Sequence, residues 1–293
     1  MAIIKYFVGI VGTGKTTVAC KMANENDLIL DSDAIRAELF GDEACQDNPS
    51  LVFATMEKRT IEALNSGRNV FYVACNIWSR KRINFIKAIK QKAPGTIFEC
   101  YIIECPIEIA RERNSARSRV VPAYVIDKQL RQFEIPYEGE GWDNIEIIHN
   151  RSFKEAEKDY LEILNRVYDF GDQKNEHHSL TLFEHCVNAF TYASKNNFPS
   201  EVRGAAIVHD FGKAWTQEYW EKDDGKNAHY PNHANVGAWL SLNLENSLEC
   251  AQLVNYHMLP YTDEKSQATW RARLGEKIWK ELEQLHEADE AAH

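Results

Sequence analysis

Three patterns that would each assign a protein class are missing from this sequence of 293 residues. No apolar run approaches the roughly 20 residues that cross a bilayer, and no signal-peptide pattern precedes the first apolar segment. The seven cysteines are scattered and include no CxxC pair, which argues against a disulfide framework and a zinc knuckle. We therefore expect reduced thiols in a soluble, cytoplasmic protein with no membrane partner.

Acidic residues are also missing from one long stretch. None lies between Glu62 and Glu99, although this stretch holds seven Lys and Arg residues. Such a stripe can follow a phosphate backbone, but a solvated helix face explains it equally well. Residues 1–168 hold 23 basic against 24 acidic residues, whereas residues 169–293 hold 11 against 20. This shift in charge and the chain length predict two domains, 1–168 and 169–293.

The most specific motif is GIVGTGKTT, which spans Gly9–Thr17. A short apolar run, Ile3–Val8, precedes it and a helical pattern follows, so the motif has the strand–loop–helix context of a phosphate-binding loop. We expect Lys15 to neutralise the β/γ-phosphates of ATP, and the Thr16 hydroxyl to bind Mg²⁺. The residues expected to hold ATP in this loop are Gly9, Gly12, Thr13, Gly14, Lys15, Thr16 and Thr17.

Asp33 and Arg36 follow a second short strand, at residues 28–30, at the start of an expected helix. Residues at the carboxyl end of a parallel strand face the ligand site of an α/β sheet. An Asp there can accept a hydroxyl proton during phosphoryl transfer, and an Arg can hold the phosphate of the acceptor. Alternatively, Asp33 caps the helix and Arg36 is a surface residue.

The rest of the first half alternates between helical and strand patterns. Helices are expected over residues 50–65 and 80–92, and strands over residues 70–74 and 96–103. This alternation predicts an α/β domain with a parallel, doubly wound sheet. An expected helix at residues 107–119 carries Arg113 and Arg117 four residues apart, which would place both on one face, as a lid that closes on the phosphates.

Together, these motifs resemble the polynucleotide 5′-kinase of bacteriophages and its bacterial relatives. The likeness rests on the phosphate loop, Asp33-x-x-Arg36, a strand ending at Asn76, and Arg113-Asn114-x-x-Arg117 before Val121-Pro122. It implies that Asp33 is the general base on a 5′-hydroxyl and that Arg36 orients the acceptor. It also implies that Arg113 and Arg117 contact the phosphates of ATP.

One departure from that family concerns the third strand. Its members usually carry an Asp near the end of this strand, whereas Val73-Ala74-Cys75-Asn76 has none. The contact that this Asp would make to Mg²⁺ or to the acceptor must come from elsewhere, and Asp31 is a candidate.

Most of the ten histidines lie in the second half, where strand patterns give way to helical ones. His209 and Asp210 end an apolar helix, and His185, His233 and His257 fall on separate expected helices. Converging in a helical bundle, these five side chains would form a mono- or dinuclear hydrolytic site. Imidazole and carboxylate ligands without thiolate suit Mn²⁺, Fe²⁺, Co²⁺, Ni²⁺ or Mg²⁺ better than structural zinc.

This ordered set resembles the HD phosphohydrolase superfamily, of the type fused to bacterial CCA-adding enzymes. The matching segments include Leu182–His185, Ala205–Lys213, His229–His233 and Tyr256–His257, with Asp289 near the end. The resemblance implies an all-α helical bundle and adds Asp289 to the metal ligands. It also implies that Lys213 contacts the scissile phosphate, alone or together with His178.

The two motif sets predict an enzyme that heals nucleic-acid ends. The first domain would phosphorylate a 5′-hydroxyl of RNA or DNA, and the second would remove a 3′-phosphate or open a 2′,3′-cyclic phosphate, so that a ligase can act downstream. One rival is a nucleoside or small-molecule kinase fused to an HD nucleotidase, and another is an NTP-sensing switch with an inactive HD half. RNA or DNA preference, metal identity and formation of a homo-oligomer stay open.

Overall fold

The computed structural model describes residues 1–174, 179–221 and 226–292. The chain divides into two compact units. The first contains Met1–Gln129 and Pro136–Asn150, and the second contains Leu130–Ile135 and the chain from Arg151 onward. His178 lies outside the described residues.

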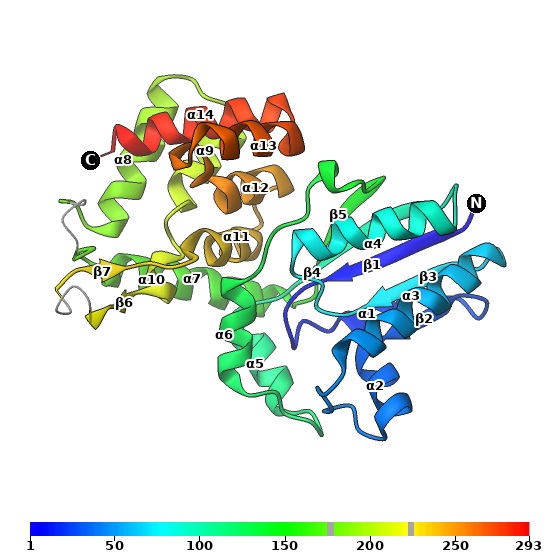
Figure 1. Ribbon diagram of the computed structural model, residues 1–293. Coiled ribbons are helices and arrows are strands. Elements are labelled where there is room, and N and C mark those ends of the chain that lie inside the picture. The colour runs from blue at the N-terminus through cyan, green and yellow to red at the C-terminus, as the bar shows by residue number, and fades with distance from the viewer. Residues whose placement is uncertain (175–178, 222–225, 293) are drawn as a thin grey trace. The chain divides into compact units, whose positions relative to one another are not determined.

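The first unit is built on five parallel strands in the order β2-β3-β1-β4-β5 (Figure 1). Their bounds are Ile3–Val8 for β1, Leu28–Asp31 for β2, Val70–Val73 for β3, Ile97–Glu104 for β4 and Asn144–His149 for β5. Strands β2 and β3 lie on one side of β1 and strands β4 and β5 lie on the other, so the strand order reverses at β1. Ligands of such sheets bind at this reversal, beyond the carboxyl ends of the strands.

Helices cover both faces of this sheet because side chains of a strand alternate between its faces. On one face, Phe7 and Phe71 pack with Val18 and Ala19 of α1. On the other face, the ring of Phe85 in α4 lies 4.6 Å from that of Tyr72. The helices following the first strand are α1 (Lys15–Met22), α2 (Ser32–Phe40), α3 (Pro49–Asn65), α4 (Ser79–Lys92), α5 (Ile107–Ser115) and α6 (Ala123–Arg131), and a 3-10 turn, η1, spans Glu138–Glu140.

The second unit is mainly helical. Its helices are α7 (Phe153–Phe170), α8 (Leu182–Lys195), α9 (Ser200–Val208), α10 (Lys213–Thr216), α11 (His233–Asn243), α12 (Leu248–Tyr256), α13 (Glu264–Leu274) and α14 (Glu276–Glu290), with a 3-10 turn, η3, at Leu259–Tyr261. Strands β6 (Glu218–Tyr219) and β7 (Ala228–His229) form a small antiparallel pair that the sequence patterns do not predict. The core includes Trp239 and Leu253, both fully buried.

The packing divides the chain earlier than the expected boundary between 168 and 169. Helix α7 packs with α8, α10 and α11, and therefore belongs to the second unit rather than closing the first. Residues 130–135 also join the second unit: the Ile135 amide donates to Asn255 Oδ1 at 2.8 Å, and the Tyr256 hydroxyl donates to the Ile135 carbonyl at 3.0 Å. An amphipathic helix beside a boundary does not reveal in its sequence which core it covers.

The structure confirms the predicted fold class, an α/β domain with a parallel sheet followed by a helical region. One local expectation was wrong, and one strand was not predicted. Helix α5 ends at Ser115 rather than at 119, and β5 follows where no strand was expected. Among the described residues, no helix combines the length and apolar character needed to cross a bilayer.

Candidate active sites

The phosphate loop lies between β1 and α1 and has a backbone that requires glycine. Gly12 and Gly14 have φ angles of 87° and 84°, a region that residues with a Cβ atom rarely adopt. A Cβ on Gly12 would lie 2.1 Å from the Ala110 carbonyl oxygen, and one on Gly14 would lie 2.3 Å from Asn150 Nδ2. The loop therefore packs against α5 and the end of β5, which fixes its shape.

Lys15 and Thr13 stabilise the loop from within. The Lys15 ammonium donates to the carbonyls of Gly9 at 3.0 Å and Ile10 at 2.7 Å, and the side chain is largely buried. Thr13 is fully buried and its hydroxyl donates to the Ile10 carbonyl, so its side chain supports the loop. Gly12, Gly14, Lys15, Thr16 and Thr17 line a cavity of about 1270 Å³.

Thr16 and Asp31 form an oxygen pair beside this loop. The Thr16 hydroxyl donates to Asp31 Oδ2 at 2.6 Å, and Asp31 Oδ1 accepts from the Asp33 amide at 2.8 Å. A hydroxyl and a carboxylate are ligands that Mg²⁺ accepts alongside phosphate and water. Asp31 is therefore placed where it can supply the carboxylate that is missing from the end of β3.

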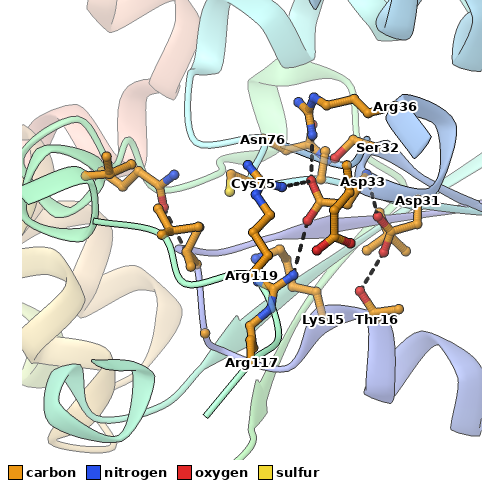
Figure 2. A pocket seen from close by; sticks show the side chains of 18 of the residues that line it. Lys15, Thr16, Asp31, Ser32, Asp33, Arg36, Cys75, Asn76, Arg117 and Arg119 are labelled. Atoms are coloured by element: carbon orange, nitrogen blue, oxygen red, sulfur yellow. Dashed lines mark hydrogen bonds and ion pairs between the residues drawn. The ribbon is translucent and has the colours of Figure 1, made fainter. Parts of the chain in front are cut away.

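Asp33 lies in the same cavity, at the start of α2, and three arginines surround its carboxylate (Figure 2). Arg36 Nη1 lies 2.5 Å from Oδ1, Arg119 Nη1 lies 3.3 Å from the same oxygen, and Arg117 Nη2 lies 3.3 Å from Oδ2. The Asp33 side chain stays 32% exposed, so solvent or an acceptor can reach it. Three guanidinium groups around one carboxylate leave a net positive charge, which suits a polyphosphate.

Arg113 and Arg117 do not share a helix face, contrary to the expectation. Because α5 ends at Ser115, Arg117 and Arg119 lie in the segment after the helix. Arg113 remains on α5, lines the cavity, and donates to the Asn150 carbonyl at 2.8 Å. The arginines therefore reach the cavity from a helix and from a loop.

The basic stripe of α4 is also less uniform than its sequence indicates. Arg82 is completely buried and pairs with Glu140 through two hydrogen bonds of 2.7 and 2.5 Å. It therefore fixes η1 to α4 and is unavailable to a ligand. Lys81 instead lines the cavity.

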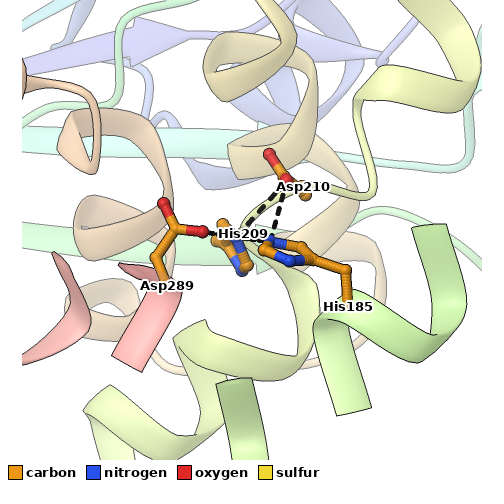
Figure 3. Close-up of side chains that lie close together, drawn as sticks. All are labelled: His185, His209, Asp210 and Asp289. Carbon is orange, nitrogen blue, oxygen red and sulfur yellow. Dashed lines mark hydrogen bonds and ion pairs between the residues drawn. The ribbon is translucent and has the colours of Figure 1, made fainter. Parts of the chain in front are cut away.

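The second site gathers His185 of α8, His209 and Asp210 after α9, and Asp289 of α14 (Figure 3). His185 Nε2 lies 3.0 Å from Asp289 Oδ1, 3.3 Å from His209 Nε2 and 3.4 Å from Asp210 Oδ2. Atoms that each lie about 2.1 Å from one metal ion are separated by about 3.0–3.4 Å in octahedral or tetrahedral geometry. The four ligand atoms therefore have the spacing of a metal shell.

Asp210 also faces a second group. Its other oxygen, Oδ1, lies 3.3 Å from His233 Nε2 and 3.8 Å from His257 Nε2, and these two nitrogens are 3.1 Å apart. One carboxylate oxygen thus faces each group, which is the arrangement of a bridging ligand. The geometry fits a dinuclear centre, one of the two forms that the sequence allowed.

Backbone carbonyls select the tautomer of three histidines. The Nδ1 atoms of His209, His233 and His257 lie 2.9, 2.9 and 2.7 Å from carbonyls three residues earlier in the chain. When Nδ1 donates to a carbonyl, Nε2 is left with a lone pair for a metal. Each of these Nε2 atoms points into the cluster.

The protonation equilibria also suit a cation. Against the effect of burial, Lys213 and His209 hold the pKa of Asp210 well below its usual range, so this carboxylate stays ionised. Burial, with His233 and His209 nearby, lowers the pKa of His257 to about 3, so its imidazole is neutral. Burial opposes protonation of His185, but Asp210 and Asp289 raise its pKa to about 9, which a metal would reverse by displacing the proton.

Lys213 lies beside the second site as expected. Its ammonium is 2.5 Å from Asp210 Oδ2 and donates to Gln173 Oε1 at 2.9 Å. A cation next to a bridging carboxylate can bind the phosphate of a substrate.

The sequence reasoning missed three residues that contact these sites. Arg119 ends the expected helix at residues 107–119 and was given no role, although its position two residues after Arg117 was a usable signal. Asn150 donates to the Thr13 carbonyl at 2.7 Å, and Tyr261 donates to Asp289 Oδ2 at 2.8 Å. Neither residue belongs to a local motif, because each meets its partner only through the fold.

Comparison with known proteins gives two family matches in this chain. Residues 4–136 match the model described as an AAA domain, and residues 176–292 match the HD domain. No curated protein matches the chain significantly.

Solved structures resemble about half of the chain. A candidate kinase from Chloroflexus aurantiacus shares 16% identity over 53% of this chain and 87% of its own, with a TM-score of 0.42. A sugar kinase from Janibacter sp. HTCC2649 shares 18% over 56% and 94%, with a TM-score of 0.38. A fungal RNA kinase shares 15% over 58% and 87%, with a TM-score of 0.36. None of these distant likenesses identifies a substrate.

The matched families and the predicted ligands found together indicate an enzyme rather than a scaffold. The kinase-like domain implies a nucleotide with Mg²⁺, and the HD domain implies a divalent metal. The chain joins an N-terminal α/β domain of the P-loop kinase fold to a C-terminal helical region that contains an HD domain.

Proposed function

We propose that this enzyme heals both ends of a broken nucleic acid. Its first unit transfers the γ-phosphate of ATP to a 5′-hydroxyl of RNA or DNA. Its second unit removes a 3′-phosphate or opens a 2′,3′-cyclic phosphate. Breaks that leave these ends need both reactions before a ligase can join them.

The first unit supplies charge and a base for the transfer. The 5′-oxygen bonds to the γ-phosphorus as the bond to the bridging oxygen of ADP breaks, and Asp33 accepts the hydroxyl proton. Lys15, Arg113 and Arg117 stabilise the transferring phosphate, while Arg36 orients the acceptor. Mg²⁺ held at Thr16 would offset the charge of the β- and γ-phosphates.

The observation that carries the choice of acceptor is the cavity beside the phosphate loop. At about 1270 Å³ it exceeds the 300–1000 Å³ of most small-molecule sites. Its lining continues past Asp33 to Gln46, Phe53 and Lys81, so there is room for more than the phosphates of ATP and a single hydroxyl. A chain of nucleotides fits this extent better than a free nucleoside.

The second unit has the groups that phosphate-ester hydrolysis needs. When bound, two divalent ions supply Lewis-acid charge and a water of lowered pKa. His185, His209, Asp210, His233, His257 and Asp289 would hold these ions. Lys213 binds a phosphate oxygen of the substrate and so orients the ester.

One substrate tests both activities. An RNA with a 5′-hydroxyl and a 3′-phosphate is incubated with ATP, Mg²⁺ and Mn²⁺, with a matching DNA and a free nucleoside in parallel, and the ends are resolved on a gel. We expect both ends of the oligonucleotide to change. If only the nucleoside is phosphorylated, the proposal is wrong.

A second candidate is a nucleoside kinase fused to an HD nucleotidase. The observation that favours it is the charge of residues 169–293, which hold 11 basic against 20 acidic residues and so attract a long polyanion poorly. The free nucleoside in the same assay separates this candidate from end healing.

A further inference from the structure

The cavity wall beyond Asp33 contains an aromatic side chain that the phosphoryl transfer does not use. Trp78 lines the same cavity as Lys15 and Asp33, next to Lys81 and Phe53. We propose that Trp78 is a stacking platform for a base of a single-stranded acceptor, and that Lys81 binds the adjoining phosphate. This inference rests on the proposed kinase function and specifies its acceptor as an oligonucleotide.

The local structure holds Trp78 out toward the cavity. It is the N-cap residue of α4 and has an extended backbone, with φ −102° and ψ 121°. Both of its neighbours point inward: Ile77 is 1% exposed and Ser79 is 5% exposed, whereas Trp78 is 37% exposed. The buried residues on each side of Trp78 therefore hold the backbone in place and leave the indole at the rim of the cavity.

Trp78 and the proposed general base, Asp33, follow the ends of two adjacent strands. Strands β2 and β3 pair in parallel, with Asp31 opposite Val73. Asp33 follows the end of β2 and Trp78 follows the end of β3, so both emerge at one edge of the sheet. An acceptor whose 5′-hydroxyl meets Asp33 can extend its next nucleotides along this edge.

Lys81 adds the charge that a phosphate needs. Its ammonium lies 4.2 Å from the centre of the Trp78 ring and 6.0 Å from that of Phe53. Helix α4 itself contains no Asp or Glu, so no carboxylate of its own helix neutralises this charge. A cation resting on an indole can bind a phosphate while a base stacks on the ring.

Stacking recognises the form of the ligand rather than its sequence. Every base has a flat π-face, so a single indole serves all four bases. A sugar or a single nucleoside has no second base that could stack on Trp78, so this side chain adds little to its binding. The arrangement therefore selects a chain of nucleotides and stays indifferent to sequence.

The test compares Trp78→Ala and Trp78→Phe with the wild type on three acceptors. These are a 5′-hydroxyl tetranucleotide, the same oligonucleotide with its second base removed, and a nucleoside 3′-monophosphate. Phe153→Ala, which removes a ring that is 83% exposed in the second unit, is the matched control. We measure KM and kcat for each acceptor, and KM for ATP.

We expect Trp78→Ala to raise KM for the intact tetranucleotide about tenfold and to leave KM for ATP unchanged. Trp78→Phe should restore most of the loss. Loss of the second base should weaken the wild type about tenfold but Trp78→Ala hardly at all, because the stacking partner is already absent.

The outcomes separate this inference from the proposed function. If the wild type phosphorylates no oligonucleotide, the proposed function fails. If the wild type acts on the tetranucleotide but Trp78→Ala retains its KM, the platform is wrong and the kinase stands. An equal loss on ATP and all acceptors would assign Trp78 a structural role instead and overturn the inference.

Discussion

Asp33 in the first unit and Asp210 in the second each lie among several nitrogen atoms, but in different surroundings. The Asp33 side chain is 32% exposed and meets three arginines, whereas the Asp210 side chain is 4% exposed and meets imidazoles and a lysine. Ion pairs that solvent reaches contribute about 0–1 kcal/mol, so Arg117, whose side chain is 37% exposed, can exchange partners at small cost. Buried charges lack that freedom.

This difference matches the chemistry proposed for each site. A kinase must admit ATP and an acceptor and release both products, so cationic groups that rearrange around phosphates are an advantage. A metal centre keeps its ions through each turnover, and fixed ligand atoms favour binding. Three of the histidines, His209, His233 and His257, are held at both ring nitrogens, Nδ1 by a backbone carbonyl and Nε2 by the cluster.

The largest predicted effects come from variants that disable one site at a time, each assayed for both activities. Lys15→Ala should lower kinase activity about a thousandfold or more and leave phosphatase activity intact, because the phosphates lose their main cation. Asp210→Asn should abolish phosphatase activity and preserve kinase activity, because both metal groups lose the shared carboxylate. Each retained activity also reports that the variant is folded. Loss of both activities in either variant would contradict the division into two independent sites.

Metal removal should affect only the second site once Mg²⁺ is restored. Dialysis against a chelator should abolish phosphatase activity and lower the thermal midpoint by about 5–10 °C. This is the shift expected on removal of an ion whose free concentration was about 100 times its Kd. Re-addition of Mn²⁺ should reverse both effects, as followed by calorimetry. In His185→Ala the midpoint should respond much less to Mn²⁺, and an unchanged response would show that the ion binds elsewhere.

A smaller effect is expected from the arginine that the sequence reasoning undervalued. Arg119→Ala should lower kcat of the kinase about 100-fold, because this guanidinium lies 3.3 Å from the Asp33 carboxylate in the cavity. Arg111→Ala is the matched control from the same basic segment. Arg111 pairs with Glu108 and Asp127, and we expect a change of less than about threefold. Similar losses in both variants would point to the folding of this segment instead.

Local patterns predicted the parts of both sites that lie within one element. The phosphate loop, Asp33-x-x-Arg36 and His209-Asp210 are contiguous, and strand or helix periodicity places each of them. The predicted metal ligands that lie on separate helices were also found together. Their roles, like those of the kinase residues, stay predictions until activity is measured.

What the sequence could not predict depends on distant packing. The assignment of α7 to the second unit follows from which core it covers. Arg82 is buried against Glu140, a partner that lies 58 residues away in the chain and that no local pattern reveals. The end of α5 at Ser115 moved Arg117 off the helix, and no strong breaker marks that point. Asn150 and Tyr261 gain their roles only when β5 and η3 reach the sites.

The smallest predicted effect concerns a buried carboxyl of the second unit that is no metal ligand. Burial, a hydrogen bond with Glu249 and the nearby charge of Glu201 raise the pKa of Glu281 to about 7, opposed by Lys277 at 4.0 Å. A raised carboxyl pKa costs the folded state nothing below the unfolded pKa, near 4.5, and progressively more as the pH rises to about 7.

Glu281→Gln should therefore stabilise the protein at pH 8 by about 1 kcal/mol, or roughly 3 °C in thermal midpoint, with little gain at pH 4.5. Gln keeps the shape of the side chain and a donor for Glu249, so the change isolates the charge. Glu162→Gln removes an exposed carboxylate of α7 and should leave the pH dependence unchanged. Midpoints measured across this range for both variants check the sign. A gain that is equal at both pH values would mean that folding leaves the pKa of Glu281 unchanged, so that its buried position does not penalise its charge.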